Sequence, residues 1–370
     1  MGRATVYDLA RCGRRVLVLD ADPRAAARGA RRYGGGRATP ASVDATDARE
    51  LAGAFADAAA VVNCAPYGFN LRVMEAALDA RCHYLDLGGL FHTTRKQLAL
   101  DATFRRAGLL AVLGMGSAPG ITNVLARAGC DGLSRVRSIR IYNGGADFTR
   151  YPAPVAFGFS PATVLDEFTE RPMVFEAGRF QGRPPRSGAE DYSFEAGRQR
   201  VHLSLHSEVA TLPVSFRKQG IRECFFKIAY EPALADRLQL LIDLGLADTN
   251  AGPRGVAPRQ VLLDCFRRLA KPPDSIDDRD YLSVVVIGED RKGRVRVRHD
   301  LTALPQRRPP LSAVASDTGF APAIVARMIL EGRIPERGVL PPERCVPVAP
   351  FLAALAERGM RPRVMLTREK

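Results

Sequence analysis

Short apolar runs alternate with helix-forming stretches along the first third of the chain. The runs predict buried strands of a parallel sheet, whose two faces are both covered, at residues 16–19, 61–64, 83–87 and 109–113. The stretches between them predict helices at residues 3–12, 70–80 and 94–107. Another helix begins at Asp22-Pro23, where Asp serves as the N-cap and Pro occupies the first helical position. This alternation is typical of a doubly wound α/β domain.

The pattern changes after Asn123. Longer connections rich in Pro and Gly separate predicted strands at residues 139–142, 201–205, 225–229, 282–287 and 295–297. From Leu311 onward helical stretches return, including residues 321–332 and 350–359. We therefore predict an α/β protein in which a Rossmann-type domain is joined to an α+β second domain with a mixed sheet.

The first domain lacks the strand with which a dinucleotide fold normally begins. In such folds an apolar strand runs into a Gly-x-Gly-x-x-Gly turn, and the start of the next helix holds the pyrophosphate. Here a helix follows Met1-Gly2 directly, with Gly2 in the place of the third glycine. Two explanations are open: a translation start assigned to an internal Met, or a real loss in a cofactor-deficient paralogue. Deleting this central strand leaves its two neighbours about twice the ~4.8 Å strand spacing apart.

The carboxyl ends of the predicted strands form the predicted cofactor site, because ligands bind there in open α/β sheets. Asp20 ends the strand at residues 16–19, where a carboxylate accepts hydrogen bonds from ribose hydroxyls and repels a 2′-phosphate. We therefore predict NAD as the cofactor. The other predicted cofactor-binding residues are Gly2, Asn63, Ala65, Pro66, Tyr67, Asp86, Gly88, Gly114, Met115, Gly116 and Pro119.

Composition and charge narrow the class of protein. The chain has 370 residues, enough for two domains, and a formal net charge of +14. Its Arg residues are spread along the chain without a dense basic block, so we predict no nucleic-acid partner. No apolar run approaches the ~20 residues of a membrane span, and the start lacks a signal peptide. The seven cysteines contain no Cys-x-x-Cys pair, so we expect a cytoplasmic protein without disulfides.

Four stretches of the chain carry a resemblance to a known family. They are Val-Val-Asn-Cys-Ala-Pro-Tyr-Gly-Phe-Asn at 61–70, Cys-His-Tyr-Leu-Asp-Leu-Gly-Gly at 82–89, Gly-Met-Gly-Ser-Ala-Pro-Gly-Ile-Thr-Asn at 114–123 and His-Ser-Glu-Val-Ala-Thr-Leu-Pro at 206–213. In this order they resemble the saccharopine dehydrogenase-like oxidoreductases over nearly the whole chain. They are more similar to the L-lysine 6-dehydrogenases than to the saccharopine reductases. One departure is Ala118-Pro119-Gly120, because saccharopine and carboxynorspermidine enzymes typically carry Asp-Pro-Gly there.

The resemblance implies both an organisation and an activity. It implies a split dinucleotide-binding domain at residues 1–122 and 311–370, with a substrate-binding domain at residues 123–310 that forms a homodimer through its sheet. The implied activity is NAD-dependent oxidation of the CH–NH2 group of a small amino-acid substrate, with ε-deamination of lysine as the leading expectation. The alternatives are an NAD(P)H-dependent reductase of the saccharopine or carboxynorspermidine dehydrogenase type and a truncated, non-catalytic paralogue.

Oxidative deamination needs a titratable group beside the nicotinamide. Apolar and polar residues alternate along 201–208, which predicts a strand with His202, His206 and Glu208 on one face. A solvated sheet face is the other interpretation of His202. His206 and Glu208 also lie in a family-like stretch, so one of them is the predicted proton carrier.

Two further residues are predicted to shape the site of the substrate ammonium group. They are Asp147, which follows the turn Gly144-Gly145, and its companion Tyr142, which ends the predicted strand at residues 139–142. Asp147 could equally be a turn residue that bonds its own backbone. His202 and His206 also have the spacing of a helical zinc motif. The alternation of apolar residues argues against a helix there, so we predict no metal site.

Overall fold

The first third of the chain folds as helices and strands in alternation, as the apolar runs predict. The computed structural model describes residues 1–252, 255–270, 272–273 and 275–368. Asp22 caps the second helix as predicted, since its side chain accepts a hydrogen bond of 2.8 Å from Arg24 N–H. The elements are α1 (Gly2–Arg11), β1 (Val16–Asp20), α2 (Pro23–Tyr33), β2 (Ala38–Ser42), α3 (Ala48–Phe55), β3 (Ala60–Asn63), α4 (Asn70–Asp79), β4 (His83–Asp86), α5 (Leu90–Leu98), α6 (Asp101–Arg106) and β5 (Leu110–Val112).

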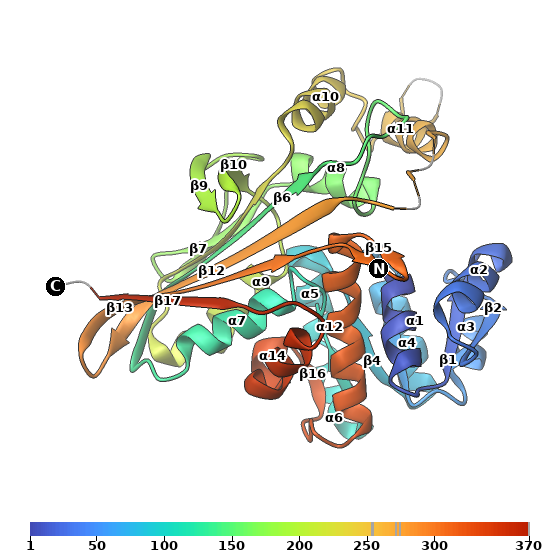
Figure 1. Ribbon diagram of the computed structural model, residues 1–370, viewed down its shortest axis with the longest axis horizontal. Helices are drawn as coiled ribbons and strands as arrows, with labels where there is room; N and C mark the ends of the chain where they lie inside the picture. Colours follow the sequence, from blue (N-terminus) through green and yellow to red (C-terminus); the bar gives the residue numbers. More distant parts are fainter. Residues whose placement is uncertain (253–254, 271, 274, 369–370) are drawn as a thin grey trace.

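The parallel strands form two separate sheets. β1 pairs with β2, while β3, β4, β5 and β16 (Gly338–Leu340) form a four-stranded sheet in the order β16-β5-β4-β3. In Figure 1, β1 and β2 lie with α2 and α3 at the right, beside α1. Within the described ranges no strand is hydrogen-bonded between β1 and β3. The break falls where the sequence pattern lacks its first strand.

The long helix α12 (Ala313–Leu330) packs against α1. Gly319 allows the close approach, because a Cβ there would lie 2.6 Å from the Cβ of Ala4. Thr5 Oγ1 donates a hydrogen bond of 2.9 Å to the Gly319 carbonyl oxygen. By length and composition α12 could cross a membrane, but 78% of it is buried inside the structure, as in the core helix of a soluble protein.

The second domain is built on a nine-stranded mixed sheet, which confirms the predicted fold class. β11 runs parallel to β6, whereas β12 is antiparallel to both β6 and β13. Figure 1 shows α7 beneath these long strands and α8, α10 and α11 at the top. The strands are β6 (Arg135–Asp147), β7 (Met173–Glu176), β8 (Arg179–Gly182), β9 (Glu190–Phe194), β10 (Gly197–Leu203), β11 (Glu223–Ala229), β12 (Asp278–Asp290), β13 (Gly293–Ala303) and β17 (Arg363–Arg368). The helices are α7 (Ile121–Cys130), α8 (Pro161–Thr169), α9 (Glu208–Ser215), α10 (Pro232–Asp243) and α11 (Pro258–Arg267).

The C-terminal residues divide between the two domains. β16 joins the parallel sheet beside β5, whereas β17 pairs with β13 at the edge of the mixed sheet. Between them lie α13 (Pro342–Cys345) and α14 (Val348–Ala356). A short hairpin of β14 (Gln306–Arg307) and β15 (Pro310–Leu311) precedes α12.

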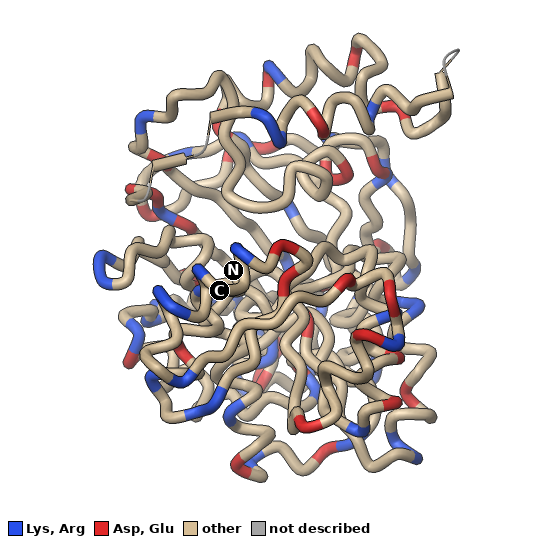
Figure 2. The backbone as a smooth tube through the Cα atoms, turned by 90° about the vertical axis from the view of Figure 1, so that its right-hand side faces the viewer, with Lys and Arg blue, Asp and Glu red and all other residues tan. Residues whose placement is uncertain are grey.

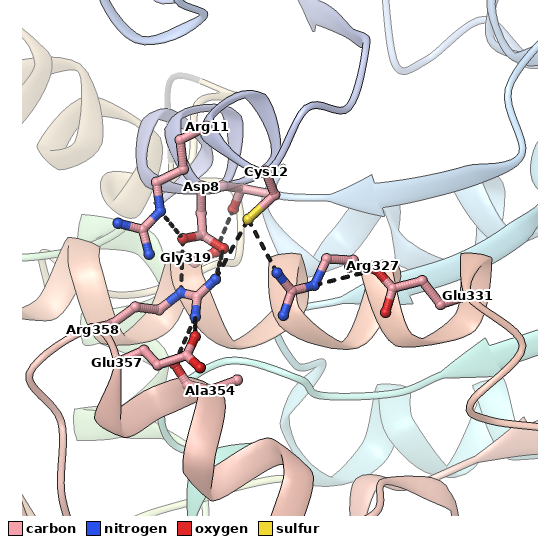
Figure 3. A network of polar contacts seen from close by, with 10 residues as sticks. Asp8, Arg11, Cys12, Gly319, Arg327, Glu331, Ala354, Glu357 and Arg358 are labelled. Carbon is pink, nitrogen blue, oxygen red and sulfur yellow. Dashed lines mark hydrogen bonds and ion pairs between the residues drawn. The ribbon is translucent and has the colours of Figure 1, made fainter.

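A buried ion pair fastens α1 to these C-terminal helices (Figure 3). Arg358, just after α14, donates hydrogen bonds of 2.7 Å from Nε and Nη2 to the two carboxylate oxygens of Asp8. The two side chains are 1% and 2% exposed. Arg327 of α12 lies beside them and contacts Cys12 Sγ at 3.2 Å. Three segments that are far apart in the sequence are thus held together by one polar network.

One predicted strand ends earlier than expected. The alternation along 201–208 predicts a strand through Glu208, but β10 ends at Leu203 and Glu208 begins α9. Leu205 remains buried after the chain has left the sheet, so the apolar alternation outlasts the strand. The predicted helix at 94–107 is likewise divided into α5 and α6.

The positive charge is distributed over the molecule. Figure 2 shows Lys and Arg interspersed with Asp and Glu throughout both domains. Several surface arginines are paired with acids, for example Arg368 with Asp290 at 2.7 Å. The net charge of +14 therefore arises from many separate positions.

Candidate active site

A cavity of about 1040 Å³ lies between the parallel sheet and the second domain. One wall includes Ala65 after β3, Gly88 after β4 and Ser117 after β5. The opposite wall includes Glu167 and His206 of the second domain. Because the carboxyl ends of parallel strands are where such folds bind ligands, this cavity is the candidate active site.

The buried carboxylate of Asp86 organises two of the strand ends. It accepts hydrogen bonds from Gly88 N–H at 2.9 Å and from Gly114 N–H at 2.7 Å, and Gln97 Nε2 donates a third at 2.6 Å. Burial raises the pKa of Asp86, and these hydrogen bonds oppose the rise. Asp86, predicted as a cofactor ligand, therefore lies behind the cavity wall and shapes it.

Gly88 and Gly114 are held against the ring of Pro119. A Cβ on either glycine would lie 2.9 Å or 2.8 Å from a Pro119 ring carbon, and their φ values are 126° and 67°. Both conditions exclude larger residues. Of the three, Gly88 and Pro119 line the cavity, whereas Gly114 supports them from behind.

The end of β3 is organised by amide hydrogen bonds. Asn63 Oδ1 accepts a hydrogen bond of 3.1 Å from Ala65 N–H, and Asn63 Nδ2 donates to Asn70 at 2.9 Å. Ala65, Pro66 and Tyr67 line the cavity as predicted. Asn63 lies behind them.

The other predicted cofactor residues lie off the cavity wall. Met115 is fully buried, Gly116 is packed under the Leu87 carbonyl, and Gly2 faces Cys64, which itself lines the cavity. Asp20 is exposed at the end of β1, and its side chain accepts a hydrogen bond of 2.9 Å from Asp22 N–H. It therefore lies outside the cavity, across the break between the two parallel sheets.

The arrangement fits a nicotinamide dinucleotide. Met1, immediately before α1, lines the cavity, so the N-terminal end of this ten-residue helix faces it. Backbone N–H groups and the helix dipole at such an end attract phosphate. The glycine turn at Gly88 lets a planar ring approach the backbone on the opposite side. Ala65, Gly88 and Pro119 could thus hold the cofactor between α1 and the second domain.

His206 is oriented by a carboxylate on its far side. Its Nδ1 is hydrogen-bonded to Glu208 Oε2, and its ring stacks on Phe226 at a centroid distance of 3.7 Å. Thr122 Oγ1, at the start of α7, donates a hydrogen bond of 2.9 Å to the other carboxylate oxygen of Glu208. Burial lowers the pKa of His206, but Glu208 and, more weakly, Glu167 outweigh it and raise the pKa above its usual value. The imidazolium form is therefore favoured beside the cavity.

Glu167 and Tyr230 complete this wall and do not figure in the sequence prediction. Glu167 is 4% exposed, lines the cavity and accepts a hydrogen bond of 2.5 Å from the Tyr230 hydroxyl. Burial raises its pKa, against the opposing influence of the His206 charge. One signal was present in the sequence: Glu167 interrupts the apolar face of α8 formed by Val164 and Phe168.

Asp147 and Tyr142 are not brought together. Asp147 lines the cavity, but its carboxylate accepts from Tyr151 at 2.5 Å and from Thr149 N–H at 2.9 Å. Asp147 thus also bonds the backbone of its own turn, which is the alternative role that the sequence left open for it. Tyr142 stacks on Tyr192 at 3.7 Å in an aromatic cluster away from the cavity, because alternate residues of β6 face opposite sides of the sheet. Tyr142 therefore does not line the cavity with Asp147, and the prediction that the two residues share one site is wrong.

A pair of buried carboxyl groups joins the two domains at the cavity edge. Asp280 of β12 accepts a hydrogen bond of 2.8 Å from Asn143 Nδ2 and contacts Asp317 of α12. Burial raises the pKa of both groups, and the charge of Asp280 raises that of Asp317 further. A hydrogen bond between two carboxyl groups requires a proton, so the contact favours the form in which one of them is protonated.

Comparison with known proteins agrees with this two-part architecture. Residues 1–112 match the family model of the saccharopine dehydrogenase NADP binding domain, and residues 116–360 match that of the saccharopine dehydrogenase C-terminal domain. The chain belongs to the saccharopine dehydrogenase family. This confirms the resemblance seen in the four sequence stretches.

Two curated proteins are similar to most of the chain. Carboxyaminopropylagmatine dehydrogenase of Synechocystis sp. is 24% identical over 307 residues, which are 79% of this chain and 75% of the relative. Carboxynorspermidine synthase of Vibrio cholerae is 24% identical over 327 residues, which are 81% of this chain and 76% of the relative. The chain is thus an oxidoreductase of this family.

A solved structure of the saccharopine dehydrogenase family has the same fold. The L-Glu-forming saccharopine dehydrogenase of Saccharomyces cerevisiae, solved without ligand, matches with a TM-score of 0.73 and 16% identity. The match covers 98% of both chains. The NADP binding domain model also supports a nicotinamide cofactor.

Proposed function

We propose that this chain is an NAD(P)H-dependent reductase that joins a primary amine to a carbonyl compound through a new secondary amine. The proposal rests above all on His206, a cavity-lining imidazole backed by the buried carboxylate of Glu208. The similarity to two enzymes named for carboxylated polyamines favours this reaction over the deamination of lysine.

The reaction requires one hydride and proton transfers at both the amine nitrogen and the carbonyl oxygen, with a net uptake of one proton. Overall, R–NH3⁺ + R′CHO + NAD(P)H + H⁺ gives R–NH2⁺–CH2R′ + NAD(P)⁺ + H2O. Ala65, Gly88 and Pro119 would hold a reduced nicotinamide cofactor, which would supply the hydride for the iminium carbon. His206 protonates the carbonyl oxygen as the nitrogen attacks, because its imidazolium form is favoured, and then takes a proton from the new C–N nitrogen. Glu208 keeps the ring in place and stabilises its positive charge.

Oxidative deamination of lysine is the second candidate. The observation in its favour is Ala118, which lines the cavity at the position where saccharopine and carboxynorspermidine enzymes typically carry Asp. In that reaction a bound oxidised nicotinamide would accept a hydride from the amine-bearing carbon and His206 would receive a proton from the nitrogen. Water would then attack the imine carbon, and ammonia would leave.

We propose NAD(H) as the preferred cofactor, on account of Asp20. Its carboxylate at the end of β1 would meet a 2′-phosphate with like charge. Replacing Asp20 by Ser is expected to raise the affinity for NADPH relative to NADH, measured by fluorescence titration. An unchanged ratio would show that Asp20 does not discriminate between the two cofactors.

Initial rates decide between the proposed reactions. Oxidation of NADH or NADPH is followed with an amino-acid semialdehyde together with propane-1,3-diamine, putrescine, agmatine or L-lysine. Turnover that requires both the semialdehyde and an amine supports the reductase. Reduction of NAD⁺ by L-lysine alone would support the deaminase instead. No turnover in either direction, with no thermal stabilisation by either dinucleotide, would favour the non-catalytic paralogue.

A further inference from the structure

We infer that Glu167, held by Tyr230, binds the ammonium group of the amine substrate and accepts its proton. This inference rests on the proposed function and specifies one subsite of the same cavity. The substrate class is a primary amine that is positively charged in solution.

Glu167 occupies a position that does not favour a carboxylate. It projects from α8, which begins at the cap Ser160, and lies on the same buried face as Val164 and Phe168. Taking a charged group out of water is costly unless it is paired with an opposite charge. No Lys or Arg forms an ion pair with Glu167 among the residues that the structure describes. A cationic ligand would add a counter-charge to that of the nearby His206.

The neighbouring acid shows the contrast. Asp166, one residue earlier on α8, forms an ion pair of 2.5 Å with Arg259 and accepts a hydrogen bond of 2.7 Å from the Tyr67 hydroxyl. Its charge is already compensated within the protein, and it does not line the cavity. Of two adjacent acids, therefore, the one on the cavity is the one without an ion-paired Arg or Lys among the described residues.

The hydrogen bonds leave one acceptor of Glu167 available. Tyr230 donates to Oε2, while Oε1 has no hydrogen-bonding partner in the described part of the chain. His206 shows the same arrangement, since Glu208 occupies Nδ1 and leaves Nε2 without a partner there. Glu167 and His206 interact electrostatically and line one cavity. They therefore provide two proton-transfer groups for the two reacting partners.

The proton balance uses both groups. The Glu167 carboxylate takes a proton from R–NH3⁺, which frees the lone pair to form the N–C bond as the C=O π electrons move to oxygen. That oxygen takes the His206 proton, and neutral His206 then removes a proton from the new ammonium nitrogen. The Glu167 acid returns its proton to the hydroxyl, the C–O bond breaks, and water leaves. The regenerated carboxylate lies beside the iminium ion and offsets its positive charge.

The test compares Glu167→Gln with Asp166→Asn in the full chain. Michaelis constants for propane-1,3-diamine or agmatine, whichever the unmodified chain turns over, are measured beside that of the semialdehyde. For Glu167→Gln we expect an amine KM raised about tenfold or more, because a charge-assisted hydrogen bond is lost. The semialdehyde KM and the NADH dissociation constant, measured by fluorescence, should not change. Asp166→Asn should leave the amine KM unchanged even if it lowers the melting temperature.

Two further outcomes complete the test. Glu167→Asp, which keeps the charge but shortens the side chain, should restore part of the amine affinity and covers the case in which Glu167→Gln does not fold. An amine KM unchanged in both variants, in a chain that catalyses the reaction, would overturn the inference. If the unmodified chain turns over no amine with either cofactor, the proposed function itself fails.

Discussion

Arg358 and Asp8 form a buried, two-pronged ion pair across 350 residues of sequence, with both N–O distances at 2.7 Å (Figure 3). Removing one partner of such a pair leaves the other charge buried without compensation, which typically costs about 3–5 kcal/mol. We therefore expect Arg358→Met to lower the free energy of unfolding by that amount, measured by urea denaturation.

An exposed ion pair provides the control for this prediction. Arg267 and Asp264 are 2.5 Å apart on α11, with side chains 68% and 48% exposed. Arg267→Met should change the free energy of unfolding by less than about 1 kcal/mol. Equal effects of the two substitutions would contradict the role assigned to the buried pair.

The pH dependence of turnover should report the contact between His206 and Glu208. Since burial alone lowers the pKa of His206 and Glu208 raises it, Glu208→Gln should shift the limb of the pH–rate profile due to His206 to lower pH. His206→Gln should reduce kcat by roughly 10²–10⁴-fold, the usual contribution of a general acid–base group. His202→Gln is the matched control, because His202 does not line the cavity, and its profile should not shift.

Replacement of Gly114 tests the close packing at the strand ends. Gly114→Ala introduces both a left-handed alanine and a contact of 2.8 Å with Pro119, whereas Gly13→Ala introduces only the first, with no heavy atom within 4 Å. We expect a loss of about 1–2 kcal/mol for Gly13→Ala and a larger loss for Gly114→Ala. Denaturant unfolding of both variants measures the difference. If the two losses are equal, the Pro119 ring moves aside at little cost.

The carboxyl pair of Asp280 and Asp317 should make the protein less stable as pH rises. Their pKa values in the folded state lie above the usual 3.8, so the folded chain binds more protons than the unfolded chain above that pH. Stability from this source is complete at low pH and is lost as pH rises through the folded pKa. Asp317→Asn should therefore flatten the fall in melting temperature as pH rises above 3.8.

Asp290 provides a control of opposite sign on the same strand. Its ion pair with Arg368 lowers its pKa from 3.8 to about 2, so its contribution is present above pH 3.8 and is lost as pH falls toward 2. Above pH 3.8, Asp290→Asn should lower the melting temperature relative to the parent chain. Near pH 2 the two chains should melt at similar temperatures. If Asp290→Asn also flattened the fall in melting temperature above pH 3.8, the assignment to the buried pair would be refuted.

Local patterns predicted the fold class because the strands of the parallel sheet are short and apolar. The run Val-Leu-Val-Leu and the Asp22-Pro23 cap fix β1 and the start of α2 almost to the residue. In contrast, β2 (Ala38–Ser42) was not predicted. Its residues are small or polar and include Pro40, which a strand tolerates only at an edge. β2 lies at such an edge, paired only with β1 within the described residues.

Several residues that line the candidate site could be predicted from the sequence, but their arrangement could not. His206 was found from its sequence stretch, although the strand on which it was placed ends at Leu203. Asp86 was predicted as a cofactor ligand, but its hydrogen bonds to Gly88 and Gly114 make it a support of the wall, which only the folded chain reveals. Glu167 was missed because a single acid on an apolar helix face has no spacing pattern of its own.

The break between β1 and β3 links the binding of a dinucleotide to the stability of the β1–β2 sheet. Within the described chain, β1 is hydrogen-bonded only to β2, and β3 only to β4. The β1–β2 unit can therefore move away without breaking the hydrogen bonds between β3, β4 and β5. A cofactor that reaches from Gly88 to Asp20 would contact both sheets and hold them together. Binding of the cofactor would then slow hydrogen exchange of the β1 amides, because a ligand stabilises the form that it binds. A substitution that weakens cofactor binding would reduce this protection.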